Sequence, residues 1–256
     1  MDIGEAIGRV FGVLVAPAAA MGSFVRGARI FHPDGVVYRA DVHADVTEGA
    51  LGKLAGRLAG PALVRLSSAT QREKAGTSPR DILGLALRFN TPPGAGPAPG
   101  ARSQDLLLLS IQHLWQLPAG ALLTKPRDFL ANDYHALLPF RVDGPGVVKF
   151  RIVPEADAAR GDEGMGRLER LEDAVRRGGA VLHLQVKGEA HGAEWEALAT
   201  VVLRERVNVD QADLQFSPFH NGAGIEPVGF FQGLRWAAYH GSQVGRALRR
   251  RLGRGR

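Results

Sequence analysis

Short segments with the alternating pattern of β-strands follow one another along most of this chain, separated by residues that favour turns. The clearest begins after Arg29, where Val36, Tyr38 and Ala40 occupy every second position. Residues 106–109 are all leucine, which predicts a strand that is buried on both faces. Further strand-like segments span residues 62–67, 83–89, 147–153, 181–186 and 198–209. This density of strands predicts an α+β fold in which an antiparallel β-barrel carries helices on its outside.

The segments with helical spacing lie mostly at the two ends of the chain. They are residues 3–24, residues 163–178, which have the charge pattern of a surface helix, and residues 230–252. Residues 92–100 are rich in proline, glycine and alanine and are predicted to form a loop. We therefore expect an N-terminal helical arm over residues 1–24, one barrel domain over residues 25–248 and a basic tail over residues 249–256.

Composition excludes several classes of site and partner. The chain has no cysteine, which excludes disulfides, thiolate metal sites and cysteine nucleophiles, and suits a cytoplasmic location. No stretch of 18 uninterrupted apolar residues is present, so no membrane span is expected. The net charge of +6 arises from six arginines within residues 244–256, and the rest is about neutral. We expect a solvated tail and no nucleic-acid partner, with binding of the tail to anionic lipid or nucleic acid as the alternative.

The segment from Gln232 to Arg246 has the most informative pattern of polar residues. Offsets of four, three and four place Arg235, Tyr239, Ser242 and Arg246 on one stripe of a helix. A permanent cation beside a tyrosine favours its phenolate form, which is the oxygen ligand that ferric haem iron takes in some haem sites. By itself the stripe is also compatible with a surface row of ion pairs.

The residues that precede this stripe make the haem interpretation the stronger one. Phe216-Ser-Pro218 is followed by Gly224-Ile225-Glu226 and then by Gln232-Gly233. This order resembles the catalase family, in which Phe-x-Pro, Gly-Ile-Glu and Gln-Gly come before a helix with Arg-x-x-x-Tyr. In that family another arginine follows seven residues after the tyrosine, as Arg246 does here.

The N-terminal half resembles the same family independently. Arg29-Ile-Phe-His32 with Gly35 is similar to the Arg-x-x-His and glycine of the first barrel strand of catalases. Val64-Arg65-Leu66-Ser67 is similar to their Val-Arg-Phe-Ser, and the segment from Asp81 to Phe89 preserves the frame of Asp-Pro-Arg-Gly-Phe-Ala-x-Lys-Phe. The resemblance, which runs from about Arg29 to Arg246, indicates a small single-domain relative of the "mini-catalase" type.

The resemblance implies a role for each matching residue. It implies haem between the barrel and the C-terminal helix, with Tyr239 as the iron ligand and His32 and Ser67 as the catalytic residues. A neutral imidazole can take a proton from peroxide and return it to the departing oxygen. The remaining residues implied in haem binding are Arg235, Arg29, Arg65, Arg246 and the ring of Trp115.

Simple strand geometry supports one part of this assignment and complicates another. Arg65 and Ser67 are two apart, so they face the same side of a strand. For Ser67 alone, a hydroxyl bonded to neighbouring backbone is the alternative. Arg29 and His32 are an odd number apart, so both reach one haem only if the strand bulges, as the following Pro33 favours, or if Arg29 meets the propionates from the end of the barrel.

The sequence departs from the family at the distal side. Catalases pair the distal histidine with an asparagine shortly before an apolar strand, whereas residues 100–109 contain none and Gln104 is the nearest amide. Leucines replace the two phenylalanines of that strand, which predicts a roomier pocket. We therefore expect a haem peroxidase that reduces hydrogen peroxide or organic hydroperoxides, with weak residual catalase activity. Its partners would be a peroxide and an unidentified electron donor, in a dimer or tetramer.

Three alternatives stay open from the sequence. One is an isomerase or dehydratase of lipid hydroperoxides, and another is a non-enzymatic haem-binding protein on the same fold. The third is a protein without haem whose basic tail binds lipid or nucleic acid.

Overall fold

The strands of this protein form one antiparallel sheet that closes on itself. The computed structural model describes residues 34–68, 81–92, 94, 98–113, 116, 120–156, 158, 164–190, 192–209, 214 and 216–228. The strands are β1 (Asp34–Ala44), β2 (Gly60–Ser68), β3 (Leu83–Phe89), β4 (Gln104–Leu109), β5 (Tyr134–His135), β6 (Phe140–Val142), β7 (Gly146–Pro154), β8 (Val181–Gly188), β9 (Glu196–Arg206) and β10 (Ile225–Pro227). The helical segments are α2 (Gly49–Leu58), α3 (Gly120–Leu123), α4 (Arg167–Arg176) and the 3₁₀ turn η2 (Phe129–Ala131).

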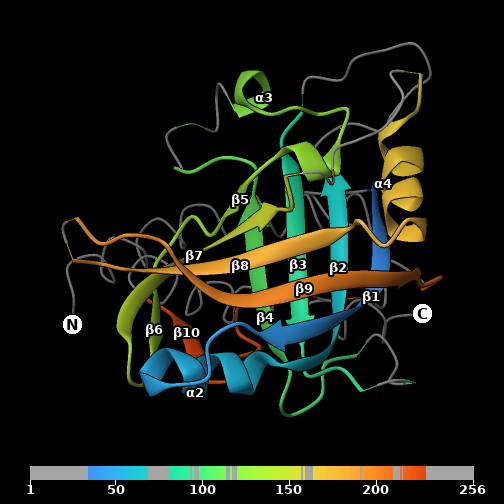
Figure 1. Cartoon of the computed structure of the whole chain (residues 1–256). Coiled ribbons are helices and arrows are strands. Elements are labelled where there is room, and N and C mark those ends of the chain that lie inside the picture. The colour runs from blue at the N-terminus through green and yellow to red at the C-terminus, as the bar shows by residue number, and fades with distance from the viewer. Residues whose placement is uncertain are drawn as a thin grey trace, which may run out of the picture. The chain divides into compact units, whose positions relative to one another are not determined.

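The order of pairing closes the barrel. The sheet runs β10-β6-β7-β5-β4-β3-β2-β1-β9-β8, and an additional pairing of β7 with β8 completes the ring (Figure 1). β6 pairs with β7 beside β5, and β10 pairs with β6, so these two strands extend the sheet at one side of the ring. The predicted antiparallel barrel of an α+β protein is therefore confirmed.

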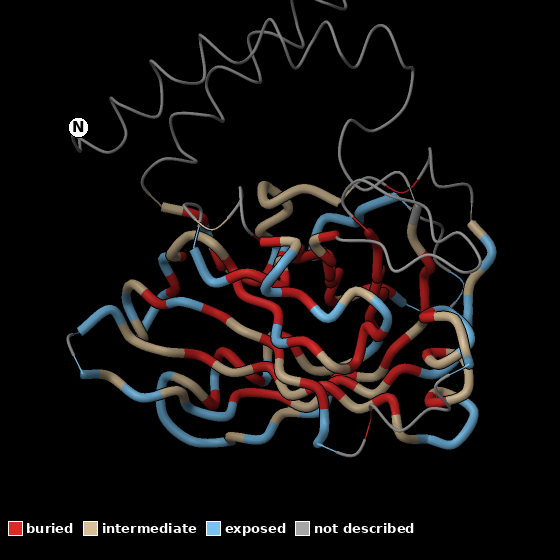
Figure 2. Tube along the Cα trace, turned by 90° about the horizontal axis from the view of Figure 1, so that it is seen from above, coloured by how far each residue is buried: buried red, intermediate tan, exposed pale blue. Residues whose placement is uncertain are grey.

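Alternation along each strand separates the interior of the barrel from its outer wall. Val36, Tyr38, Ala40 and Val42 of β1 point inward and join one large buried cluster. The register Val36↔Leu66 and Tyr38↔Val64 carries the same alternation into β2, and the pattern continues around the ring. Figure 2 shows the buried segments gathered inside the ring and the exposed ones in the outer loops.

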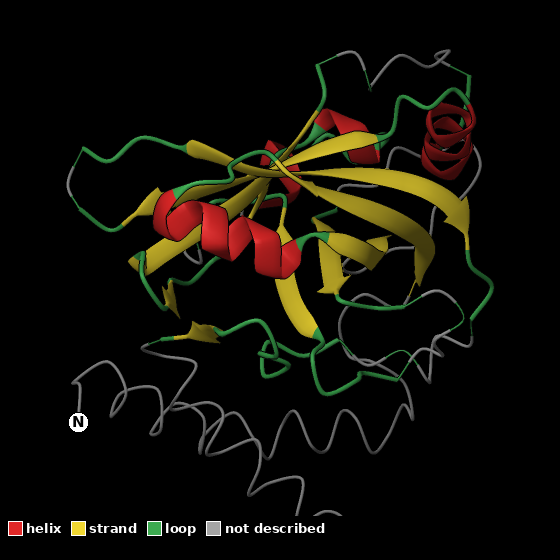
Figure 3. Ribbon diagram, turned by 60° about the horizontal axis from the view of Figure 1, so that its bottom comes forward, coloured by secondary structure: helices red, strands yellow, loops and turns green. Residues whose placement is uncertain are grey.

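The helices lie outside the strands (Figure 3). The sequence interpretation missed α2, whose Leu54, Ala55 and Leu58 nevertheless join the barrel core. It predicted the surface helix over 163–178, and α4 is found there, with Leu171 and Ala174 packed against the core. The predicted arm over 1–24, the basic tail over 249–256 and the helix over 230–252 lie outside the described residues.

Two glycines explain the tight hairpin between β6 and β7. The turn Asp143-Gly144-Pro145-Gly146 places Gly144 at φ 95° and Gly146 at φ 81°. Positive φ is strained for residues with a Cβ, so glycine at these positions lets the chain reverse directly. In the part of the chain that the structure describes, no helix is long and apolar enough to cross a membrane.

Candidate functional site

The outer wall of β1–β4 brings together the described residues that the sequence assigned to haem. Strand register places them in rows, each formed by one outward residue from each strand. One row is Gly35, Ser67, Gly84 and Leu109, and the next is Val37, Arg65, Ala86 and Leu107. Arg65 and Ser67 thus face the same side, as predicted, about 7 Å apart along the strand.

Arg65 lies along the wall of the barrel over Gly35. A Cβ added to Gly35 would come within 2.6 Å of the Cζ and Nη2 atoms of Arg65, so the guanidinium packs directly against Gly35 and would have to shift for a larger residue. Arg65 is 5% exposed, which makes it a nearly buried cation on the outside of the barrel. Ser67 is also buried, and its hydroxyl donates a long 3.5 Å hydrogen bond to the carbonyl of Gly84.

Toward the end of the wall that carries Ser67, three residues near Arg65 are small, whereas Val37, opposite Arg65 on β1, packs with Leu63 and Leu214. Gly35, Gly84 and Ala86 place nothing larger than a methyl group on this wall. A flat group with acidic substituents could therefore lie close to the strands and pair with Arg65. Leu107 corrects one prediction: it points outward and is 39% exposed, so β4 is not buried on both faces.

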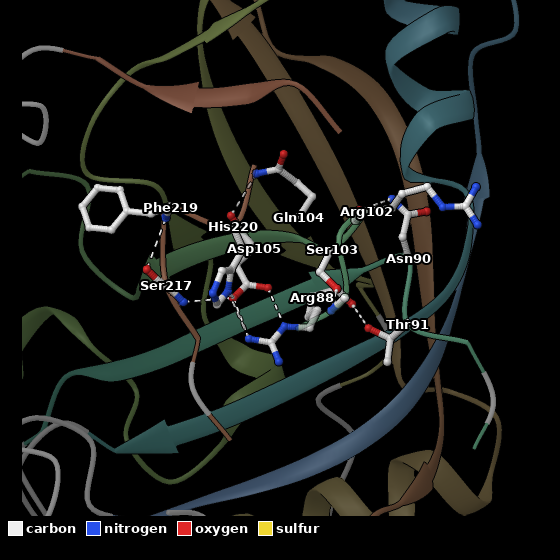
Figure 4. A network of polar contacts seen from close by, with 11 residues as sticks. Arg88, Asn90, Thr91, Arg102, Ser103, Gln104, Asp105, Ser217, Phe219 and His220 are labelled. Carbon is white, nitrogen blue, oxygen red and sulfur yellow. Dashed lines mark hydrogen bonds and ion pairs between the residues drawn. The ribbon is translucent and has the colours of Figure 1, made fainter. Parts of the chain in front are cut away.

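A buried ion pair occupies the next row of the same wall. Arg88 of β3 pairs with Asp105 of β4, with Nε 2.8 Å from Oδ1 and Nη2 2.8 Å from Oδ2 (Figure 4). Both side chains are 0% exposed. Asp105 Oδ2 also accepts hydrogen bonds from Nδ1 of His220 at 2.7 Å and from the backbone N–H of Ser217 at 2.9 Å. The guanidinium of Arg88 lies 4.8 Å from the ring centroid of Phe216.

These contacts attach residues 216–226 to the start of β4. The backbone N–H of Asp105 donates to the carbonyl of His220 at 2.8 Å, and that of Gly222 donates to the carbonyl of Ser103 at 2.9 Å. We call Arg88, Asp105 and His220, with the segment 216–226 that they hold, the clasp. Segment 216–226 contains the motifs Phe-Ser-Pro and Gly-Ile-Glu, on whose order the resemblance to catalases rests, and the clasp keeps both motifs against the barrel wall.

Gln104 belongs to the same attachment and is not a distal amide. Its Oε1 accepts from the N–H groups of Ala223 and Ile225 at 3.3 and 3.2 Å, and its Nε2 donates to the carbonyl of Ile225 at 3.2 Å. Gln104 lies on the same face of β4 as Leu106, which points into the barrel, whereas Asp105 lies on the opposite face. The amide nearest to the position of the missing asparagine is therefore bound to the backbone of Ala223 and Ile225.

The sequence interpretation also missed His220 by treating His32 as the one histidine in an informative setting. The signal that could have found the clasp was a single charge inside each of two apolar strands, Arg88 between Leu87 and Phe89 and Asp105 before four leucines. Charges in such positions are rarely buried unless they are paired.

The other assigned residues lie outside the described part of the chain. These are Arg29, His32, Trp115, Arg235, Tyr239 and Arg246. Within the described ranges, no three His, Cys, Asp or Glu side chains are grouped so that they could hold a metal ion.

Comparison with known proteins identifies the fold. No protein-family model matches the sequence, and a search of curated proteins gave no match. Among solved structures, the chain is similar to one described as the structure of a bacterial catalase, with a TM-score of 0.58 and 16% sequence identity. The similarity covers 88% of this chain and 59% of that one, so this chain spans less than two thirds of the length of that protein. The barrel is therefore of the catalase type.

Proposed function

We propose that this protein binds haem against the outer wall of β1–β4 and acts as a peroxidase on hydrogen peroxide or organic hydroperoxides. The observation that carries the proposal is the nearly buried guanidinium of Arg65, which lies over Gly35 and beside Gly84 and Ala86 on this wall. This wall suits a planar group with carboxylates, and it belongs to a barrel of the catalase type.

The proposal gives the chain's residues three tasks. Arg65, with Arg29 and Arg246, would hold the propionates, and Trp115 would stack on the ring. Tyr239 would be the axial ligand, with its phenolate form favoured by Arg235. When bound, the haem supplies the redox chemistry of O–O bond cleavage.

Proton transfer is assigned to His32, with Ser67 as the residue that orients it. In this proposal His32 takes a proton from the peroxide and returns it to the departing oxygen. The hydroxyl of Ser67 would accept a hydrogen bond from the second nitrogen of the imidazole and so fix its tautomer.

The same wall supports the view that catalase activity is weak. The outward residues of β3 and β4 nearest to Ser67 are Gly84, Ala86, Leu107 and Leu109, none of which carries an amide. An amide to orient a second peroxide is therefore missing from this part of the wall, which favours a separate electron donor.

The first experiment is the absorption spectrum of the purified protein after reconstitution with haem. We expect a haem Soret band that Tyr239→Phe alters in position and intensity, whereas the same change at Tyr38 inside the barrel leaves it intact. Arg65→Met should weaken haem affinity by about tenfold or more because a charge-assisted contact is lost. Arg204→Met, at an exposed ion pair, is the matched control. A wild-type protein that takes up no haem would refute the proposal.

Two assays separate the peroxidase from its alternatives. A hydroperoxide isomerase or dehydratase would convert a fatty-acid hydroperoxide without an electron donor, which product analysis detects. A non-enzymatic haem-binding protein would keep its haem spectrum and show the same negligible turnover in the wild type and in His32→Ala.

A further inference from the structure

A second site lies on the same wall, at the end of β4 where the chain leaves the barrel. A cavity of about 460 Å³ opens there, lined by residues of the loop after β4, of α3 and of the segment that leads into β5. Its volume is in the range of small-molecule sites. The register Leu109↔His135 places it beside the row that contains Ser67 and Gly84, and therefore next to the proposed haem surface.

His135 is the polar group that this cavity leaves available. It is 7% exposed, and no described residue forms a hydrogen bond with its ring. Its ring packs edge-on against Trp195, with 6.4 Å between centroids, which fixes its plane. Burial is the main cause that lowers its pKa from the ordinary 6.5, with Arg151 and His113 acting in the same direction and Asp133 against it. A nearly buried imidazole without a partner costs free energy that a ligand hydroxyl could recover.

The other buried polar groups of the cavity already have partners. The hydroxyl of Ser110 is 2.8 Å from that of Thr124, and the amide of Asn132 bonds to the backbone on both sides of Lys125. Ile111 and Ala131 supply apolar lining, and Leu123, 58% exposed, lies at the opening. Gln112, Lys125 and Asp133, which are exposed, line its solvent side. In the buried part of the cavity, His135 is thus the hydrogen-bonding group left available, and Ile111 and Ala131 supply the apolar surface beside it.

We infer that this cavity binds a hydroxylated aromatic molecule, with its ring against Ile111, Ala131 and Leu123 and its hydroxyl donating to His135. Resting on the proposed peroxidase function, we assign this molecule as the electron donor. Two phenols would each lose one electron and one proton and leave as aryloxyl radicals. The peroxide, whose O–O bond breaks, takes both electrons and both protons: hydrogen peroxide becomes two waters, and an organic hydroperoxide becomes an alcohol and water. His135 is the group that accepts the phenolic proton.

Binding is tested first, without peroxide, by calorimetric titration of the full chain with 2-methoxyphenol and with 1,2-dimethoxybenzene, which lacks the hydroxyl. We expect the phenol to bind and the ether to bind about tenfold more weakly, as one lost hydrogen bond implies. His135→Phe keeps the ring against Trp195 and should weaken phenol binding by about tenfold. His183→Phe, on the outer face of β8 and away from the cavity, is the control.

A second variant keeps the test decisive if His135→Phe is unstable. Ala131→Leu fills the cavity from another side and should also weaken binding by about tenfold or more by steric exclusion. Absence of phenol binding, equal binding of the ether, or a loss smaller than about threefold in a folded variant would overturn the inference.

Turnover then tests the assignment as electron donor. With hydrogen peroxide as oxidant, His135→Phe should raise KM for 2-methoxyphenol about tenfold while KM for peroxide is unchanged. Equal changes in both would overturn the donor assignment. Failure of the haem spectrum with intact phenol binding would refute the proposed function, whereas a normal haem spectrum without phenol binding would refute only this site.

Discussion

Replacing Asp105 by asparagine tests how much the clasp contributes to stability. The carboxylate accepts four hydrogen bonds: two from Arg88, one from His220 and one from the backbone of Ser217. Both members of the ion pair are fully buried. Asparagine has the same shape but no charge, and its NH₂ group would face donors. Because Arg88 would be left as a buried cation without its counter-charge, we expect a loss of about 3–5 kcal/mol in the free energy of unfolding.

The assay is equilibrium unfolding in urea, followed by circular dichroism. With a slope of about 2.5 kcal/mol per molar, the expected loss lowers the midpoint by about 1–2 M. Asp41→Asn is the matched control because Asp41 forms its ion pair with Arg204 at 2.7 Å, close to the 2.8 Å of Arg88 and Asp105, but both side chains are about half exposed. Such pairs contribute about 0–1 kcal/mol. Equal midpoints for the two variants would refute the reasoning.

Hydrogen exchange shows where the stability is lost. The N–H groups of Ala223 and Ile225 donate to Gln104 in the same attachment. If the clasp holds residues 216–226 on β4, Asp105→Asn should speed exchange at these two amides more than at Val64 in the barrel. Uniform acceleration throughout the barrel would mean that the ion pair stabilises the whole fold and not the attachment. The double variant Arg88→Met/Asp105→Leu should lose less than Asp105→Asn, since no unpaired buried charge remains.

Three further predictions use other features of the structure. Gly222→Ala should cost about 1–3 kcal/mol in urea unfolding, since its Cβ would lie 2.3 Å from backbone just before β4, whereas Gly56→Ala on the open face of α2 should be neutral or stabilising. Tyr38→Phe should raise stability by about 1 kcal/mol, because its buried hydroxyl has no hydrogen-bond partner among the described residues; a loss above that size would contradict this. His135 has a lowered pKa through burial, so the unfolded chain binds its proton first and stability falls as pH drops below about 6.5. The stability of His135→Phe should fall less over that range, and parallel pH curves for the two proteins would refute this.

Much of the barrel could be predicted because strand alternation is local. Val36, Tyr38, Ala40 and Val42 identify the inward face of β1 without knowledge of its neighbours. The same counting rule correctly placed Arg65 and Ser67 on one side. It missed α2, where Gly49, Gly52 and Gly56 lower helix propensity and only contact with the barrel core stabilises the helix.

The candidate site likewise has one part that the sequence indicated and one part that it did not. The order of Arg65, Ser67 and the motifs after Phe216 indicated a catalase-type arrangement, because that order follows the chain. The partner of a buried charge cannot be found from the order of residues along the chain. Asp105 meets Arg88 across a strand pair 17 positions away and His220 across 115, so no local pattern links the three.

By itself, the sequence determined which residues alternate, where the turns fall and which charges interrupt apolar runs, since these follow from neighbouring positions. Only the tertiary structure decided which polar residues of β4 face the outside of the barrel and which face its inside. The register of β3 on β4 placed Asp105 outward beside Arg88 and turned Gln104 inward to the backbone of Ala223 and Ile225. Adjacent residues of a strand face opposite sides, so a single step in register would turn Asp105 away from Arg88 and Gln104 away from the backbone that it binds.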